Sequence, residues 1–97
     1  MTETLDLSRR IAIRPDVLAR SVGAETVILD LASGTYFGLD TVGARIWTLS
    51  QRGSTLGEIC DTLVAEYDVS RERLEADVVR LAVELSRARL VDLVDAD

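Results

Sequence analysis

Histidine and lysine are absent from this 97-residue chain, and cysteine occurs once. The chain therefore lacks the commonest general base and most of the nitrogen and sulfur ligands that hold metals. Cys60 cannot form an internal disulfide and falls on the apolar side of a predicted helix, so we interpret it as a core residue. The many Asp and Glu residues follow predicted helix surfaces and caps. We therefore expect no catalytic residues, no metal site and no cofactor.

Long apolar runs are also missing. No segment approaches the roughly 20 apolar residues that cross a bilayer, and the first residues, MTETLDLSRR, lack the apolar stretch of a signal peptide. The stretch SGTYFG contains two glycines but does not have the strand-to-helix context of a phosphate-binding loop. The missing membrane span and the missing signal peptide predict a cytoplasmic protein that does not contact membranes.

The charge is strongly acidic, with a formal net charge of -6 at pH 7. This balance opposes binding to nucleic acid and to anionic lipid. Hydrophobic residues make up 47% of the chain, which is enough for one modest core. We expect a single domain over residues 9–94, preceded by a flexible lead-in over residues 1–8.

Strand-like segments come first in the chain. They are residues 17–22, 26–30 and 35–39, with a weaker extended segment at residues 9–13. The main segments contain β-branched or aromatic residues and are joined by short turns, which predicts an antiparallel three-stranded sheet.

Helical periodicity fills most of the chain after this sheet. The predicted helices are residues 42–51, 55–66 and 71–89. Asp40 or Thr41 can cap the first helix, Thr55 and Glu58 fit a capping box for the second, and Ser70 can cap the third. Strands followed by helices predict an α+β fold in which the three-stranded sheet packs on three helices.

The third predicted helix has two apolar strips, although a core-facing helix needs only one. The broad strip comprises Leu74, Val78, Leu81, Ala82, Leu85 and Ala88, and the second strip comprises Ala76, Val79 and Val83. If the second strip lies beside strand 35–39 at the sheet edge, the two form a groove for an extended peptide. Alternatively, loops or the segment before Pro15 cover the strip, or it is a dimer contact.

The aromatic residues gather near this edge. Tyr36 and Phe37 are adjacent on the strand and therefore face opposite sides of the sheet, and the sequence leaves open which of them faces a peptide. Leu39 and Trp47 are expected to join the sheet to the first helix.

An ordered set of motifs runs through about residues 11–91. The set comprises Leu29, Asp30, Gly34, Tyr36, Leu39, Asp40, Gly43, Ile46, Trp47, Gly53, Thr55, Glu58, Ile59, Leu63, Tyr67, Asp68, Val69, Asp77, Val78, Leu81, Leu85 and Leu90. This pattern resembles the PqqD-like family, the RiPP recognition elements that hold the leader peptides of ribosomally made, post-translationally modified peptides.

The resemblance implies a winged-helix-like fold and a protein without catalytic activity. It further implies that a precursor leader peptide binds as an added strand along strand 35–39, beside helix 71–89, and is delivered to a modifying enzyme such as a leader peptidase or a radical enzyme. The implied contacts are Thr35, Tyr36, Phe37, Gly38, Ala76, Asp77, Val79, Arg80 and Val83.

Two departures from the family pattern refine this expectation. Arg89 stands where many relatives have Gly, which predicts an extended third helix. The turn sequence LASG and Trp47 favour the standalone proteins of lasso-peptide clusters over pyrroloquinoline quinone peptide chaperones. The alternatives are such a chaperone, a winged-helix DNA-binding regulator, or a dimerisation module. We expect a monomer or a weak dimer.

Overall fold

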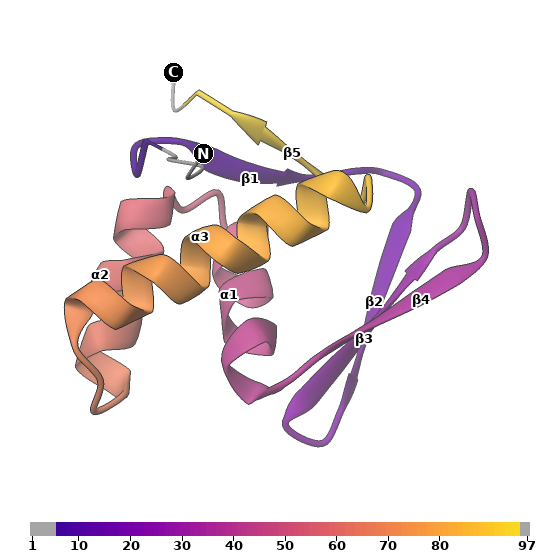
Figure 1. Ribbon diagram of the computed structural model, residues 1–97. Helices are drawn as coiled ribbons and strands as arrows, with labels where there is room; N and C mark the ends of the chain where they lie inside the picture. The colour runs from indigo at the N-terminus through magenta and orange to yellow at the C-terminus, as the bar shows by residue number, and fades with distance from the viewer. Residues whose placement is uncertain (1–5, 96–97) are drawn as a thin grey trace.

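The computed structural model describes residues 6–95, so residues 1–5 of the predicted lead-in lie outside the described residues. The elements occur in the order β1 (Arg10–Ile13), β2 (Val17–Val22), β3 (Glu25–Asp30), β4 (Thr35–Leu39), α1 (Thr41–Gln51), α2 (Leu56–Glu66), α3 (Arg71–Arg87) and β5 (Val91–Val94). Figure 1 shows α3 lying across α1 and α2, with β1 and β5 along one side and the sheet of β2, β3 and β4 beside the helices.

The three-stranded sheet has the order β2-β3-β4 and is antiparallel, which confirms the predicted α+β class. Its register places Ile28 of β3 between Ala19 of β2 and Phe37 of β4. Within the described residues β4 has a strand partner on one side only. The sheet therefore ends at β4, which leaves this strand's outer edge without a neighbouring strand.

A second sheet was not predicted. β5 pairs with β1 in an antiparallel two-stranded sheet in which Arg10 is opposite Val94. Each strand has four residues, and the two come from opposite ends of the chain. Such short segments carry little local signal, and their pairing depends on contacts that the rest of the fold creates.

Side chains cap the helices where the sequence predicts them. Asp40 accepts a hydrogen bond from the Gly43 amide at 2.8 Å and begins α1. Thr55 and Glu58 form a complete capping box at α2, with bonds of 3.1 and 2.8 Å. Ser70 accepts a bond from the third residue of α3. These bonds satisfy helix amides that have no partner within the helix.

The prediction that the third helix extends to Arg89 is wrong. α3 ends at Arg87, and Arg89 adopts a left-handed backbone with φ of 62°. The amides of Arg89 and Leu90 donate to the carbonyls of Ser86 and Leu85, both at 3.0 Å. This hydrogen-bond pattern ends helices and usually places Gly at the left-handed position. A non-glycine residue can occupy this position at a modest energetic cost, so Arg89 does not extend the helix.

The core lies where the helices meet the inner face of the sheet. α1 packs on β1 and β3, while α3 packs on α2 and β5. The buried apolar residues include Ile28, Leu39, Ile46, Trp47, Leu56, Ile59, Cys60, Leu63, Leu74, Val78, Leu85 and Val91. The core assignments of Leu39, Trp47 and Cys60 are therefore confirmed.

Leu7, in the described part of the predicted lead-in, packs against the domain, and the residues up to Arg9 contact the start of α2. The Leu7 carbonyl accepts a hydrogen bond from the Gly57 amide at 2.8 Å, and the Arg9 carbonyl accepts one from Leu56 at the same distance. The start of α2 has free amides that need acceptors, and this segment supplies them. A Cβ at Gly57 would approach the Leu7 carbonyl oxygen to 3.3 Å, so glycine permits this close contact.

Candidate functional site

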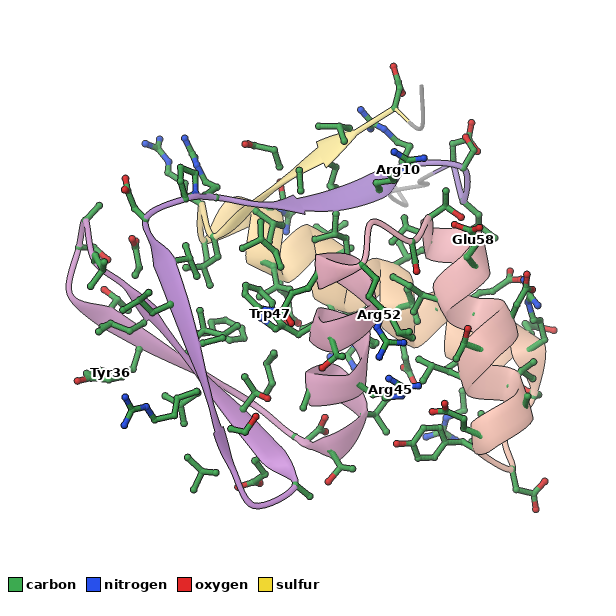
Figure 2. The ribbon with its side chains drawn as sticks, turned by 180° about the vertical axis from the view of Figure 1, so that it is seen from behind. Arg10, Tyr36, Arg45, Trp47, Arg52 and Glu58 are labelled. Atoms are coloured by element: carbon green, nitrogen blue, oxygen red, sulfur yellow. The ribbon has the colours of Figure 1, made fainter. Side chains whose placement is uncertain are left out.

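β4 forms one wall of the candidate site and presents different residues on its two faces. Leu39 is buried and Phe37 is half-buried against the core, whereas Tyr36 is 69% exposed. Figure 2 shows Tyr36 pointing away from the helices and Trp47 beside α1 on the inner side of the sheet. Phe37 therefore faces the helices and Tyr36 faces the opposite side of the sheet, and which of them contacts a bound peptide stays open.

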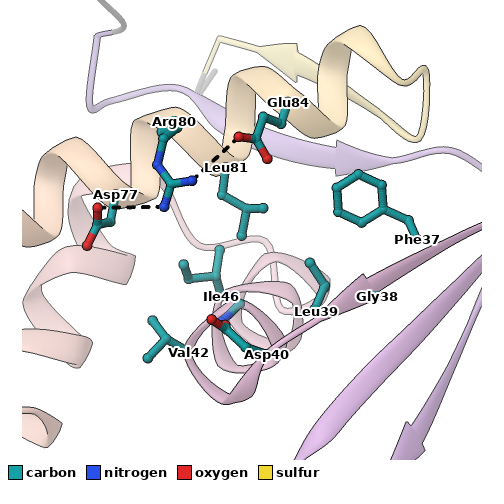
Figure 3. Close-up of a pocket in the computed structure, with 11 residues that line it drawn as sticks. Phe37, Gly38, Leu39, Asp40, Val42, Ile46, Asp77, Arg80, Leu81 and Glu84 are labelled. Carbon is teal, nitrogen blue, oxygen red and sulfur yellow. Dashed lines mark hydrogen bonds and ion pairs between the residues drawn. The ribbon is translucent and has the colours of Figure 1, made fainter.

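A groove of about 420 Å³ lies between β4 and α3, with α1 beneath it. Its residues from the strand and from α1 are Phe37, Gly38, Leu39, Asp40, Val42, Gly43 and Ile46, and those from α3 are Asp77, Arg80, Leu81 and Glu84. Figure 3 shows the apolar side chains of Leu81, Ile46 and Val42 gathered below α3, with Phe37 at one end. This groove offers an apolar floor beside an unpaired strand edge.

The rim of the groove on α3 is charged. Arg80 lies between two carboxylates, with its guanidinium nitrogens 3.7 Å from Asp77 Oδ1 and 3.5 Å from Glu84 Oε1 (Figure 3). All three side chains are substantially exposed, so these pairs contribute little to folding stability. Their main effect is to keep polar groups at the groove mouth while the floor stays apolar.

The junction between β4 and α1 brings the floor close to the strand. A Cβ at Gly43 would lie 3.2 Å from Asp40 Oδ1 and 3.3 Å from the Leu39 side chain. Glycine at this position lets the first turn of α1 approach the end of β4 closely. As a result, Val42 and Ile46 of α1 can line the same groove as β4.

The structure brings four of the nine sequence-predicted contacts together around the groove: Phe37, Gly38, Asp77 and Arg80. Thr35 and Tyr36 lie on β4 and are exposed, but they do not line the groove. The assignment of the nine residues as peptide contacts stays a prediction.

The strip of Ala76, Val79 and Val83 does not line the groove. At about 100° per residue, the centre of this strip lies more than 100° around α3 from Asp77, Leu81 and Glu84, which do line it. The exposed Arg80 lies in this shorter arc, and the broad core strip fills the longer arc, with its edge at Leu81 turned toward the groove. The helix pattern reveals two faces beside the core but does not show which of them the sheet adjoins.

Sequence reasoning missed much of the groove floor. From the sequence alone, Val42 and Ile46 have no predicted role in the site, and Leu81 falls in the core strip of the third helix. All three contribute to the core, yet each also lines the groove. Only its spacing could mark Glu84 as a site residue. It lies seven residues after Asp77 and therefore on the same side of α3.

The described residues offer little that resembles a reactive site. Burial raises the pKa of the Cys60 thiol above its ordinary value, which disfavours the reactive thiolate. Within residues 6–95 no group of three or more His, Cys, Asp or Glu side chains is placed to hold a metal ion. No helix in the same range is long and apolar enough to cross a membrane.

Comparison with known proteins shows the family to which this chain belongs. The chain matches the family described as coenzyme PQQ synthesis protein D (PqqD) over residues 25–91, and it belongs to that family. The matched range runs from β3 to the start of β5 and includes all groove-lining residues. The search of curated protein sequences found no significant match to the chain.

Two solved structures resemble the whole fold. The structure of TbiB1 in complex with the TbiA(beta) leader peptide is 40% identical in sequence, with a TM-score of 0.80, and the match covers 84% of this chain and 94% of TbiB1. The structure of a lasso peptide synthetase B1 complexed with its leader peptide is 26% identical, with a TM-score of 0.77 and coverage of 88% and 98%. Both relatives are thus seen with a leader peptide bound.

Proposed function

We propose that this protein is a non-catalytic RiPP recognition element that binds the leader segment of a ribosomal precursor peptide. The peptide adds as a strand to the free edge of β4 and places alternate apolar side chains in the groove below α3. The observation that carries the proposal is the unpaired β4 edge beside a groove with an apolar floor, in a chain 40% identical to a protein solved with a leader peptide. Strand addition uses such edges because main-chain hydrogen bonds supply affinity and side-chain pockets supply specificity.

The protein then delivers the bound precursor to a modifying enzyme such as a leader peptidase. We assign it to lasso-peptide biosynthesis because one relative is a lasso peptide synthetase B1. The net charge of -6 disfavours the DNA-binding alternative, because duplex DNA is a polyanion.

Peptide binding is tested with one variant in the groove floor and one control variant outside the groove. The ligand is the fluorescein-labelled leader of the precursor peptide encoded beside this gene, and fluorescence anisotropy measures its Kd. Leu81→Asp places a carboxylate in the groove floor and should weaken binding by about tenfold or more, since a buried unpaired charge is costly. Val69→Asp makes the same kind of change at an exposed apolar residue between α2 and α3, outside the groove, and should alter Kd less than about threefold.

A second test concerns the main chain and leaves the protein unchanged. Successive residues of a strand direct their amides to opposite sides, so only every second leader amide can pair with β4. N-methylation of single leader residues should therefore weaken binding at alternate positions within the bound segment. A loss of binding that does not alternate between successive leader positions would contradict strand addition. Equal leader affinity of the Leu81→Asp and wild-type proteins would contradict a role of the groove in binding.

A further inference from the structure

Beyond the groove, a second hollow lies at the end of the sheet where β4 begins. Its volume is about 340 Å³, and its lining residues are Arg14, Asp16, Val17, Asp30, Ala32, Ser33 and Arg89. The register joins Val17, Asp30 and Thr35 in one row across the sheet. Residues two apart on a strand share a face, so this row lies on the same side as the buried Ile28 and the groove-lining Phe37. The hollow therefore adjoins the row that follows Phe37, on the helix side of the sheet.

Arg14 and Arg89 supply the positive charge of this hollow. The Arg14 amide donates a hydrogen bond to the Leu90 carbonyl at 3.1 Å, which holds the corner between β1 and β2 against the end of α3. Arg14 Nε lies 4.0 Å from Asp92 Oδ2, whereas Arg89 has no ion-pair partner among residues 6–95. The guanidinium of Arg89 is exposed and keeps its donors available to a ligand.

Two carboxylates line the same hollow, so its formal charges balance. Asp30 accepts hydrogen bonds from the Ala32 amide at 3.1 Å and from the Ser33 hydroxyl at 2.8 Å, so its oxygens stabilise the turn between β3 and β4. Within the described chain, neither Asp16 nor Asp30 forms an ion pair with the two arginines. Binding of an anion in the hollow therefore depends on direct hydrogen bonds to guanidinium groups rather than on a positive local field.

The backbone of Arg89 makes an arginine at this position unexpected. Its φ of 62° lies in the left-handed region, where helix ends of this kind usually have Gly. A non-glycine residue there is strained, and strained residues cluster at functional sites. Arg87 already places a cation in the last turn of α3, so the negative end of the helix dipole does not require a second one. The side chain of Arg89 therefore calls for a role of its own.

A bound peptide would bring a ligand to this place, a step that rests on the proposed function. A peptide strand that pairs with β4 leaves the groove past Phe37 and Thr35 and then meets the hollow. We propose that Arg89, together with Arg14, binds the carboxylate of an Asp or Glu of the precursor just beyond the strand-paired segment. The planar guanidinium presents parallel N–H donors that match the two oxygens of a carboxylate. The groove thus selects apolar residues, and the hollow selects an acidic residue at a fixed distance from them.

The test compares variants that each remove one positive charge. Arg89→Gln and Arg14→Gln alter the hollow, whereas Arg73→Gln alters an exposed arginine in the first turn of α3, at the opposite end of the helix. Fluorescence anisotropy measures the Kd of the labelled leader encoded beside this gene. The same measurement is made for leaders in which each Asp or Glu is replaced, one at a time, by Asn or Gln.

Both hollow variants should raise the leader Kd by about threefold to fivefold, and Arg73→Gln by less than about 1.5-fold, since an exposed ion pair contributes up to about 1 kcal/mol. The difference should shrink when the salt concentration rises from about 0.05 M to about 0.5 M. One leader substitution should raise the Kd of the wild-type protein to the same extent and should have almost no further effect on Arg89→Gln, because the two changes remove the same contact.

Unchanged leader affinity of Arg89→Gln, beside the expected loss in Leu81→Asp, would overturn this contact and leave the groove intact. A lower Tm of Arg89→Gln at unchanged Kd would show that the arginine only stabilises the end of α3. Slower cleavage of the precursor by the leader peptidase at unchanged Kd would place the carboxylate on the enzyme, which also overturns the proposal. Failure of the wild-type protein to bind the leader at all would contradict the proposed function and, with it, this inference.

Discussion

At the scale of single residues, the two adjacent aromatics of β4 have separate surroundings. Phe37 lies half-buried against the core and lines the groove, whereas Tyr36 points outward. The alternation itself follows from the sequence, because neighbouring strand residues always face opposite ways. The choice between the two orientations depends on how the sheet meets the helices. That contact is distant in the chain and cannot be inferred from the strand alone.

This difference predicts unequal effects of the two truncations on stability. Phe37→Ala should lower the free energy of unfolding by about 1–2 kcal/mol, because it removes a half-buried ring from the core. Tyr36→Ala should change it by less than about 0.5 kcal/mol. Urea unfolding measures both, and a larger loss from Tyr36→Ala than from Phe37→Ala would contradict the orientation of β4.

At the scale of elements, local signals predict structure well where a few neighbouring residues decide it. The caps at Asp40, Thr55 and Ser70 could be read from the sequence because each joins residues only three positions apart. The β1–β5 sheet could not, because its strands are short and far apart in the chain. The side of α3 that lines the groove could not be predicted for a related reason, since periodicity defines faces without saying what they meet.

The end of α3 provides a prediction at this scale. Arg89 holds a left-handed backbone, which glycine adopts without steric cost. Arg89→Gly should therefore raise the free energy of unfolding by about 0.5–1 kcal/mol. This is a net gain, because the greater entropy of glycine in the unfolded chain offsets part of the backbone strain that is removed. Arg89→Ala is the matched control, because alanine keeps the strain and should give no increase. Equal gains in both variants, measured by urea unfolding, would show that the backbone of Arg89 is not the cause.

At the scale of the whole molecule, one ion pair links the first two helices. Arg45 of α1 donates to both carboxylate oxygens of Glu66 at the end of α2, at distances from 2.8 to 3.3 Å. These hydrogen bonds hold the pKa of Glu66 below its ordinary value of 4.5. A carboxyl group with a lowered folded-state pKa stabilises the fold above its unfolded-state pKa, and this contribution is lost as the pH falls through the folded-state value.

Glu66→Gln should therefore lower the Tm at pH 7, and the difference from the wild-type protein should disappear toward pH 3. Thermal unfolding followed by circular dichroism across this range measures the effect. Glu25→Gln removes a carboxylate that has no ion pair among the described residues and should leave the pH dependence almost unchanged. A constant difference between Glu66→Gln and wild type from pH 7 to pH 3 would contradict a role for the charged pair.

The β1–β5 sheet brings the two ends of the described chain together. Its two strands lie side by side at the ends of the described chain, with Arg10 opposite Val94 (Figure 1). Among the described residues, no member of either strand lines the groove. A polypeptide that enters at β1 and leaves at β5 therefore does so at one place, away from the site. Domains with adjacent ends tolerate insertion into a loop of another protein. The unit could accordingly be grafted whole into an enzyme, with its groove left open.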